Sequence, residues 1–271
     1  MHRPLTESDL LLHGPLQRIG RRIRLFAEID STNTYALAHA EELGDGAVVA
    51  AEVQTAGRGR ARRRWLSPRG SSILLSILLL EPDGSPWVTH ATMLAAVAAA
   101  EAVDAEANCR VSLRWPNDLM IAGKKLGGIL AESTPLPTRP EQAQPRRALV
   151  IGIGLNCFQQ PGHFGPALAE IATSLEIECA PPIDRPALAG RLVERLDAGL
   201  SQDPANPRTW TRLREAWTTR CEDLGARVTL VESACHHAGT VLEITENGDL
   251  LVQLDSGVRR RFEPTTTTRI R

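Results

Sequence analysis

Alternating apolar and polar positions predict several β-strands in the first part of the chain. In RRIRLFAEI (21–29) every second side chain is apolar, which indicates a strand with one buried face. LMIAGKKLGGILAES (119–133) predicts a hairpin with its turn at 122–124. More continuously apolar runs predict further strands at GAVVAAEVQ (46–54), SSILLSILLL (71–80), VSLRW (111–115) and ALVIGIGLN (148–156).

Helices are predicted between these strands. VTHATMLAAVAAAEAVDAEA (88–107) is apolar on more than one face, which is typical of a buried helix. A shorter helix is expected to begin near Asp30 and to end at Gly44 and Gly46. Two more are predicted at about 185–200 and 205–219, whereas 134–147 and 157–182 should be irregular. Because strands and helices mix without strict alternation, we expect an α+β fold with a mixed sheet.

The texture of the sequence changes at residue 222. From there the chain has short alternating segments and an Asn247-Gly248 turn, which predict a small all-β unit. We therefore divide the chain into a domain of residues 1–221 and a small β domain of residues 222–271.

Composition excludes several classes of protein. The 271 residues carry a formal net charge of -1, so no overall field favours nucleic acid or an anionic membrane. No apolar run is long enough to span a bilayer, and the N-terminus lacks a signal segment. The five cysteines form no C-x-x-C pair and suggest no disulfide framework, so we expect free thiols and a cytoplasmic protein.

One local block of charge stands out in this balanced chain. QTAGRGRARRRWLSPRG (54–70) holds six arginines, and Gly57 and Gly59 let its backbone approach a ligand closely. Arginine forks suit phosphate or carboxylate oxygens. On local composition alone, a loop over an anionic small molecule and a nucleic-acid patch are about equally supported, and a solvated loop is not far behind.

Three other segments carry candidate chemistry. RWPND (114–118) precedes KLGGILAE (125–132), in which Lys125 could face a phosphate and Asp118 a hydroxyl or Mg²⁺. GIGLN (152–156) is a weak G-x-G pattern that ends on Asn156, which could read an amide or a purine edge. Ser31-Thr32-Asn33 is an ordinary helix start or a polar grip on a ligand. Alone, each of these has a plain structural explanation.

Together and in this order, the four segments resemble the biotin–protein ligases. That family carries S-T-N, G-R-G-R-x-x-R-x-W, W-P-N-D with K-x-x-G-I-L-x-E, and G-x-G-x-N, and the resemblance covers roughly residues 21–200. It implies a class II synthetase-like mixed sheet packed with helices, with an SH3-like barrel at the C-terminus. It also implies activation of biotin by ATP and Mg²⁺ to biotinyl-5′-AMP. The biotin is then transferred to a lysine of a biotin carboxyl carrier domain.

The resemblance also implies roles for individual residues. Catalytic groups would be Lys125, Arg60, Arg63 and Asp118. Biotin contacts would be Ser31, Thr32, Asn33, Gln54, Gly57, Arg58, Arg60, Lys125, Gly127 and Gly128. ATP or adenylate contacts would be Arg58, Arg63, Trp65, Asn117, Lys125 and Asn156, with Phe164 as a cover for adenine. No metal site made of protein ligands alone is expected, although Asp118 could meet the Mg²⁺ of the nucleotide.

Departures from the family pattern add further expectations. Arg62 stands where the family usually has glycine, so a positive φ there would strain the loop. The tail FEPTTTTRIR lacks the usual Gly-Glu ending, which weakens the case for contact between the small domain and ATP. Only about 20 residues precede the first predicted strand, so we expect no N-terminal DNA-binding domain. A homodimer is compatible with the sequence but is not indicated by it.

Two rival functions remain open at this stage. A lipoate–protein ligase would share the fold and K-x-x-G, but its Arg-Arg-x-Ser/Thr-Gly-Gly-Gly segment is absent. A nucleic-acid-binding protein could use the arginine block, but it would be expected to show basic or aromatic surface elsewhere.

Overall fold

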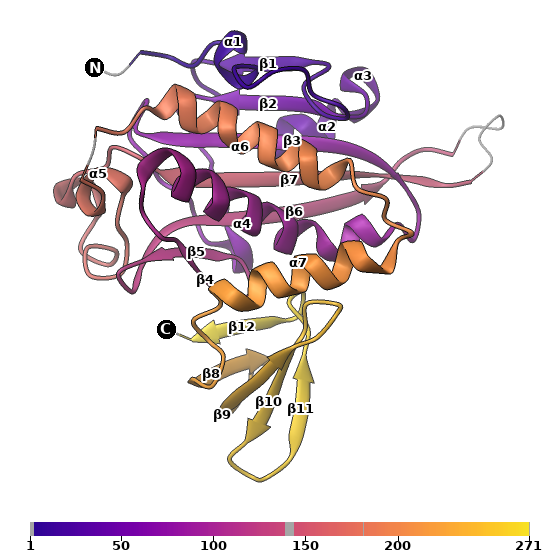
Figure 1. Ribbon diagram of the computed structural model, residues 1–271, viewed down its shortest axis with the longest axis vertical. Helices are drawn as coiled ribbons and strands as arrows, with labels where there is room; N and C mark the ends of the chain where they lie inside the picture. The colour runs from indigo at the N-terminus through magenta and orange to yellow at the C-terminus, as the bar shows by residue number, and fades with distance from the viewer. Residues whose placement is uncertain (1–2, 139–143, 181, 271) are drawn as a thin grey trace.

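A seven-stranded mixed sheet forms the centre of the larger part of the molecule (Figure 1). The computed structural model describes residues 3–138, 144–180 and 182–270. The strand order is β1-β2-β3-β7-β6-β5-β4, in which only the β1–β2 pair is parallel. The bounds are β1 Ile23–Phe26, β2 Ala47–Ala51, β3 Ser72–Pro82, β4 Ser112–Arg114, β5 Asp118–Ile121, β6 Lys124–Pro135 and β7 Arg146–Asn156. The expected α+β class is confirmed.

Helices cover both faces of this sheet (Figure 1). On one face α4 (Pro86–Ala107) and α6 (Arg185–Leu200) pack against odd-numbered side chains such as Ile77 of β3 and Ile151 of β7. On the other face α2 (Thr32–Ala38) and α3 (Ala40–Leu43) pack against Val49 of β2, Leu78 of β3 and Val150 of β7. Because side chains alternate between the two faces of a strand, a continuous apolar run supplies buried side chains to the hydrophobic cores on both sides of the sheet. The remaining helices are α1 Glu7–Leu10, α5 Leu175–Glu178, α7 Pro207–Arg220 and the 3₁₀ turns η1 Arg60–Arg62 and η2 Pro161–His163.

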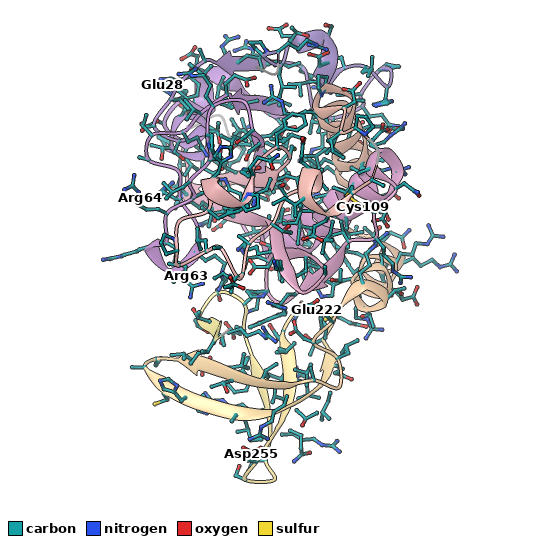
Figure 2. All side chains as sticks on the ribbon, turned by 90° about the vertical axis from the view of Figure 1, so that its left-hand side faces the viewer. Glu28, Arg63, Arg64, Cys109, Glu222 and Asp255 are labelled. Carbon is teal, nitrogen blue, oxygen red and sulfur yellow. A yellow bond between two sulfur atoms is a disulfide. The ribbon has the colours of Figure 1, made fainter. Side chains whose placement is uncertain are left out.

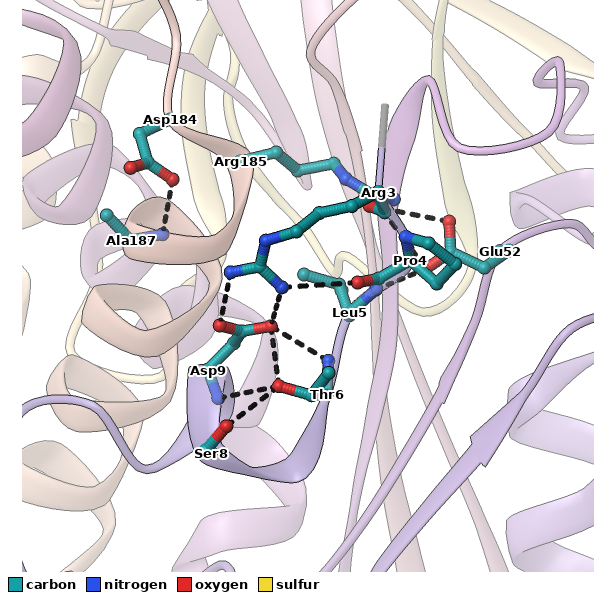
Figure 3. Close-up of polar contacts among 10 residues, drawn as sticks. All are labelled: Arg3, Pro4, Leu5, Thr6, Ser8, Asp9, Glu52, Asp184, Arg185 and Ala187. Atoms are coloured by element: carbon teal, nitrogen blue, oxygen red, sulfur yellow. Dashed lines mark hydrogen bonds and ion pairs between the residues drawn. The ribbon is translucent and has the colours of Figure 1, made fainter. Parts of the chain in front are cut away.

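The chain before β1 is held by an internal ion pair and by a hydrogen bond to Glu52 (Figure 3). Arg3 and Asp9 form an ion pair at 2.6 Å, and this guanidinium holds the pKa of Asp9 well below its usual range. Glu52, at the end of β2, accepts a hydrogen bond from the backbone N–H of Leu5 at 2.8 Å and pairs with buried Arg185 at 2.9 Å. A buried arginine needs such a partner, and here one carboxylate fixes both the N-terminal segment and the start of α6.

Residues 222–270, which we call the C-terminal module, form a five-stranded antiparallel sheet. Its order is β11-β10-β9-β8-β12, with bounds β8 Arg227–Glu232, β9 Cys235–Ile244, β10 Leu250–Leu254, β11 Arg259–Phe262 and β12 Thr267–Ile270. Trp115 joins the module to the larger part: its backbone N–H donates to Asp223 at 2.6 Å and its indole N–H to the Gly248 carbonyl at 2.9 Å. Burial raises the pKa of Asp223, although the nearby Arg269 opposes this. The division into two domains stays a prediction.

Several local predictions need correction. The helix expected from Asp30 to Gly44 is broken at His39 into α2 and α3. The loop expected at 134–147 is shorter, because β6 runs to Pro135 and β7 begins at Arg146; its residues 139–143 lie outside the described part.

The prediction of free thiols throughout was wrong. Cys109 and Cys179 form a disulfide, because the fold places the turn after α4 beside the end of α5. Cys157, Cys221 and Cys235 are free. No helix in the described ranges is long and apolar enough to cross a membrane.

Candidate active site

The floor of the main cavity is made of glycines. The cavity has a volume of about 820 Å³ and lies on the α2 side of the sheet. Ala148 and Val150 of β7 pack beneath α2 and α3, whereas the next residues on the same face are Gly152 and Gly154. Gly154 pairs with Gly128 of the neighbouring strand β6. This face of the sheet therefore changes from packed side chains to bare backbone where the cavity opens.

Each glycine of the floor allows one polar or aromatic side chain to approach. A Cβ on Gly152 would lie 2.2 Å from Oδ1 of Asn33, and one on Gly154 would lie 2.7 Å from the Trp65 ring. A Cβ on Gly128 would lie 3.2 Å from Nζ of Lys125. Asn33 of the S-T-N segment and Trp65 of the arginine block thus reach the G-x-G strand through their side chains. The K-x-x-G segment reaches it through the pairing of Gly128 with Gly154.

The start of α2 provides the polar end of the cavity. Ser31 caps the helix, and its hydroxyl accepts from the N–H of Thr34. Thr32 donates to Oε1 of Gln54 through its backbone N–H at 2.7 Å and through its hydroxyl at 3.1 Å. Asn33 is buried and donates to the Leu130 carbonyl at 3.1 Å. These fixed hydroxyl and amide groups suit a neutral polar ligand.

The arginine block forms a short, ordered loop over the cavity. The N–H of Trp65 donates to the Gly57 carbonyl at 2.9 Å, and that of Gly59 to the Arg63 carbonyl at 2.7 Å. At its tip, Ala61 and Arg62 have φ values of 52° and 58°. The position of Arg62 therefore does require the left-handed conformation, which costs a residue with a Cβ free energy.

Two arginines anchor this loop: one binds the seven-stranded sheet and the other binds the C-terminal module. Arg58 donates to Oε2 of Glu132 on β6 at 2.9 Å. Arg60 donates to the carbonyls of Pro264 and Thr267 in the C-terminal module, at 3.0 Å for Thr267. Burial lowers the pKa of Arg60, while Asp118 opposes the shift.

Two further arginines of the block lie at the cavity. Arg63 and Arg64 both line it, and Figure 2 shows them on the same side of the molecule, above the C-terminal module. Arg64 also donates to the Thr55 carbonyl at 3.3 Å. Their place in the cavity wall favours a small anionic ligand over an extended nucleic-acid surface.

Lys125 is aimed into the cavity by a bulge. The β5–β6 register shifts between Leu119 and Met120, so Leu126 is the extra residue on β6. Bulges of this kind redirect neighbouring side chains. Lys125 forms an ion pair with Asp118, and both line the cavity. Asn117 also lines it, but its side-chain amide donates to the Ile129 carbonyl at 2.8 Å and so holds the turn.

Asn156 lies at the end of β7 as expected, but both ends of its amide already have protein partners. Nδ2 donates to the Thr173 carbonyl at 2.9 Å, and Oδ1 accepts from Gln159 at 2.8 Å. Asn156 thus holds the segment after β7 against the cavity and also lines the cavity, so its contact with adenine stays a prediction. That segment contributes an apolar wall of Phe164, Leu168, Ile171 and Ala172, so Phe164 lies where an adenine cover was expected.

Two predicted contacts lie outside the cavity wall. Gly127 faces Leu119 and Leu155 in the core, because it stands on the opposite face of β6 from Gly128. Gly57 lies against the Trp65 carbonyl and Gln54, where it shapes the loop.

Several groups that the fold brings to the site were not predicted. Ser76 and Glu132 hydrogen-bond to the predicted ligand residues. The C-terminal residues Thr268, Arg269 and Ile270 line the cavity, although the tail lacked the family ending. Glu132 is the last residue of the K-x-x-G-I-L-x-E motif, and its place in that motif could have marked it as a site residue. No motif marked Thr268, Arg269 or Ile270.

Comparison with known proteins agrees with this geometry. Residues 25–156 match the model of the biotin/lipoate A/B protein ligase family. The bifunctional ligase/repressor BirA of Bacillus subtilis is 30% identical over 260 residues, which cover 95% of this chain and 77% of that protein. The biotin–[acetyl-CoA-carboxylase] ligase of Mycobacterium tuberculosis is 34% identical over 215 residues, covering 77% and 74% respectively. The chain belongs to the biotin protein ligase family.

Solved structures of the family share the fold. The biotin protein ligase of Aquifex aeolicus in complex with biotin and ATP superposes with a TM-score of 0.74. The match is 22% identical and covers 93% of this chain and 99% of that one. A match of this coverage must extend into the C-terminal module, which is longer than the uncovered share of the chain.

Proposed function

We propose that this chain activates biotin with ATP and transfers it to a lysine of a biotin carrier domain. The observation that carries the proposal is the convergence of four separated segments on one glycine floor. Ser31 and Thr32, the arginine loop, Lys125 and Gly152 come from four different elements and line a single cavity. That arrangement provides a neutral polar end, a cluster of cations and an apolar wall, which match the ureido ring, the phosphates and the adenine.

In the first step the biotin carboxylate attacks the α-phosphorus of ATP, and pyrophosphate leaves. Both reactants are anionic, so cations must reduce their repulsion and stabilise the charge that develops on phosphorus. Arg63 and Lys125 take this role, while Arg60 holds the loop on the C-terminal module. Asp118 would release Lys125 to the phosphates and would face the nucleotide's Mg²⁺, since Mg²⁺ is usually held by one or two carboxylates plus phosphates.

Mg²⁺ fits the site only as an ion that the nucleotide brings with it. Among the described residues, no group of three or more His, Cys, Asp or Glu side chains gathers closely enough to hold a metal ion. Asp118 alone supplies a carboxylate in the cavity wall. When bound, Mg²⁺ would neutralise phosphate charge, and the nucleotide would bring most of its ligands.

In the second step a lysine amine attacks the carbonyl carbon of the mixed anhydride, which gives the biotinyl amide and AMP. The anhydride is open to hydrolysis, so the arginine loop must exclude water until the acceptor arrives. The partner we propose is the biotin carboxyl carrier domain of acetyl-CoA carboxylase, in the cytoplasm. Acetyl-CoA carboxylase is the substrate named for the Mycobacterium relative.

Biotin-dependent exchange of labelled pyrophosphate into ATP tests the first step. We expect exchange with biotin and none with lipoate, which is the control acid for the related lipoate ligases. Transfer is then measured on a carrier domain and on its variant with the acceptor lysine replaced by arginine. No exchange with either acid would overturn the proposal, and exchange with lipoate alone would reassign the substrate.

A further inference from the structure

Glu132 connects the start of α2 and the arginine loop through one carboxylate oxygen. It lies on β6, and its Oε2 accepts hydrogen bonds from Nδ2 of Asn33 at 2.8 Å and from Arg58 at 2.9 Å. Asn33 belongs to the helix start at the polar end, whereas Arg58 belongs to the loop. One carboxylate therefore contacts both the segment assigned to biotin and the segment assigned to the adenylate.

A chain of hydrogen bonds extends this link into the polar end of the cavity. Gln54 accepts from Thr32, whose hydroxyl lies 2.7 Å from Oγ of Ser76. Oγ of Ser76 also lies 2.6 Å from Oδ1 of Asn33, so the single hydroxyl proton of Ser76 is shared between Thr32 and Asn33. Thr32, Asn33 and Ser76 are buried, so each side chain is fixed by its partners. Asn33 is thus the residue that connects these biotin-side groups to Glu132.

The ion pair between Glu132 and Arg58 contributes little to the stability of the fold. The Arg58 side chain is 45% exposed and that of Glu132 is 25% exposed. Pairs of this exposure are weak, because water competes for both charges. The contact is nevertheless directional, because one guanidinium N–H of Arg58 donates to Oε2 of Glu132 at 2.9 Å. Such a pair is suited to choosing between loop positions.

We propose that Glu132 is a positioning residue that holds the arginine loop over the cavity and couples its closure to the biotin-side network. The inference rests on the proposed function, because it concerns retention of the adenylate. Glu132 touches no reacting atom in this role and acts through Arg58. Glu132→Gln keeps the size of the side chain and can still accept from Asn33, but it loses the charge that attracts Arg58.

The test is the rate at which preformed biotinyl-adenylate leaves the enzyme, measured with labelled adenylate and an excess of unlabelled chase. We expect Glu132→Gln to speed release roughly three- to fivefold, the factor that corresponds to a partly exposed ion pair. The KM for biotin should stay within about twofold and the melting temperature should not change. Arg58→Ala should speed release by a similar factor, and the double variant no further than either single one.

Two variants serve as controls. Glu106→Gln breaks a partly exposed pair with Arg191 on the helices α4 and α6, away from the cavity, and should leave release unchanged. Arg58→Lys keeps a positive charge and should restore part of the retention that Arg58→Ala loses.

The experiment distinguishes an error in the role of Glu132 from an error in the proposed function of the enzyme. If the wild-type enzyme forms no adenylate, both proposals are overturned. If it forms adenylate and Glu132→Gln releases it at the wild-type rate, the positioning role is overturned alone. Strictly additive effects of Glu132→Gln and Arg58→Ala would also overturn the role, because residues acting through one contact cannot be independent.

Discussion

Replacing Gly152 by alanine should damage both the fold and the polar end of the cavity. The new Cβ would lie 2.2 Å from Oδ1 of Asn33 and 2.9 Å from its Nδ2. Because non-bonded heavy atoms prefer separations of about 3.5 Å, Asn33 would have to retreat by roughly 1 Å. That movement weakens its hydrogen bonds to Ser76, Leu130 and Glu132.

The magnitude follows from two terms. Overpacking a close-packed site costs about 1–3 kcal/mol, and each weakened buried hydrogen bond adds up to about 1 kcal/mol. A total near 3 kcal/mol lowers the melting temperature by roughly 6–12 °C for a protein of this size. The KM for biotin should rise by at least about tenfold, since Asn33 sits beside Thr32 at the start of α2.

Thermal unfolding and pyrophosphate exchange at varied biotin provide the measurements. Gly162→Ala is the matched control, because no atom lies within 4 Å of its Cβ position, and it should behave as wild type. In an Asn33→Ala background, Gly152→Ala should cost less, since the clashing atoms are gone. A Gly152→Ala enzyme with wild-type stability and wild-type KM would refute the reasoning.

Three shorter predictions concern charge, the loop and the thiols. Lys125→Ala should abolish pyrophosphate exchange because it removes a cation beside the α-phosphate, whereas Lys124→Ala should retain it; near-normal exchange by Lys125→Ala would contradict the assignment. Arg60→Gly should release labelled adenylate faster because the loop loses its contacts with the C-terminal module; retention as long as in wild type would place that role on other residues. Denatured, unreduced protein should show three reactive thiols in a titration, and five after reduction of the Cys109–Cys179 disulfide; five before reduction would contradict the pairing.

Local sequence patterns were sufficient to predict where the main strands lie and to recognise the four motifs in order. Period-two alternation located β1, and apolar runs located β3 and β7, because these signals depend only on neighbouring residues. The motifs likewise placed Lys125, Arg63 and Thr32 in one site, all of which line the cavity.

Long-range contacts were beyond such patterns. The pairing of Cys109 with Cys179 spans 70 residues, and nothing near either cysteine signals it. Gly127 and Gly128 look alike in sequence, yet only Gly128 faces the cavity, since the bulge at Leu126 decides which face each one takes. Asn156 could be placed at its strand end, but its partners Gln159 and Thr173 depend on how the following segment folds back.

The anchor of Arg60 has a consequence for the order in which the enzyme becomes competent during synthesis. The loop residue and its acceptors Pro264 and Thr267 are separated by 204 and 207 positions. At about 5–20 residues per second, the ribosome adds these acceptors roughly 10–40 s after Arg60. A nascent chain can bury its sheet and form the contact between Arg58 and Glu132 before then, but its loop still lacks the contacts of Arg60 with the C-terminal module. We therefore expect retention of the reactive anhydride to reach its full extent only after Pro264 and Thr267 have left the ribosome.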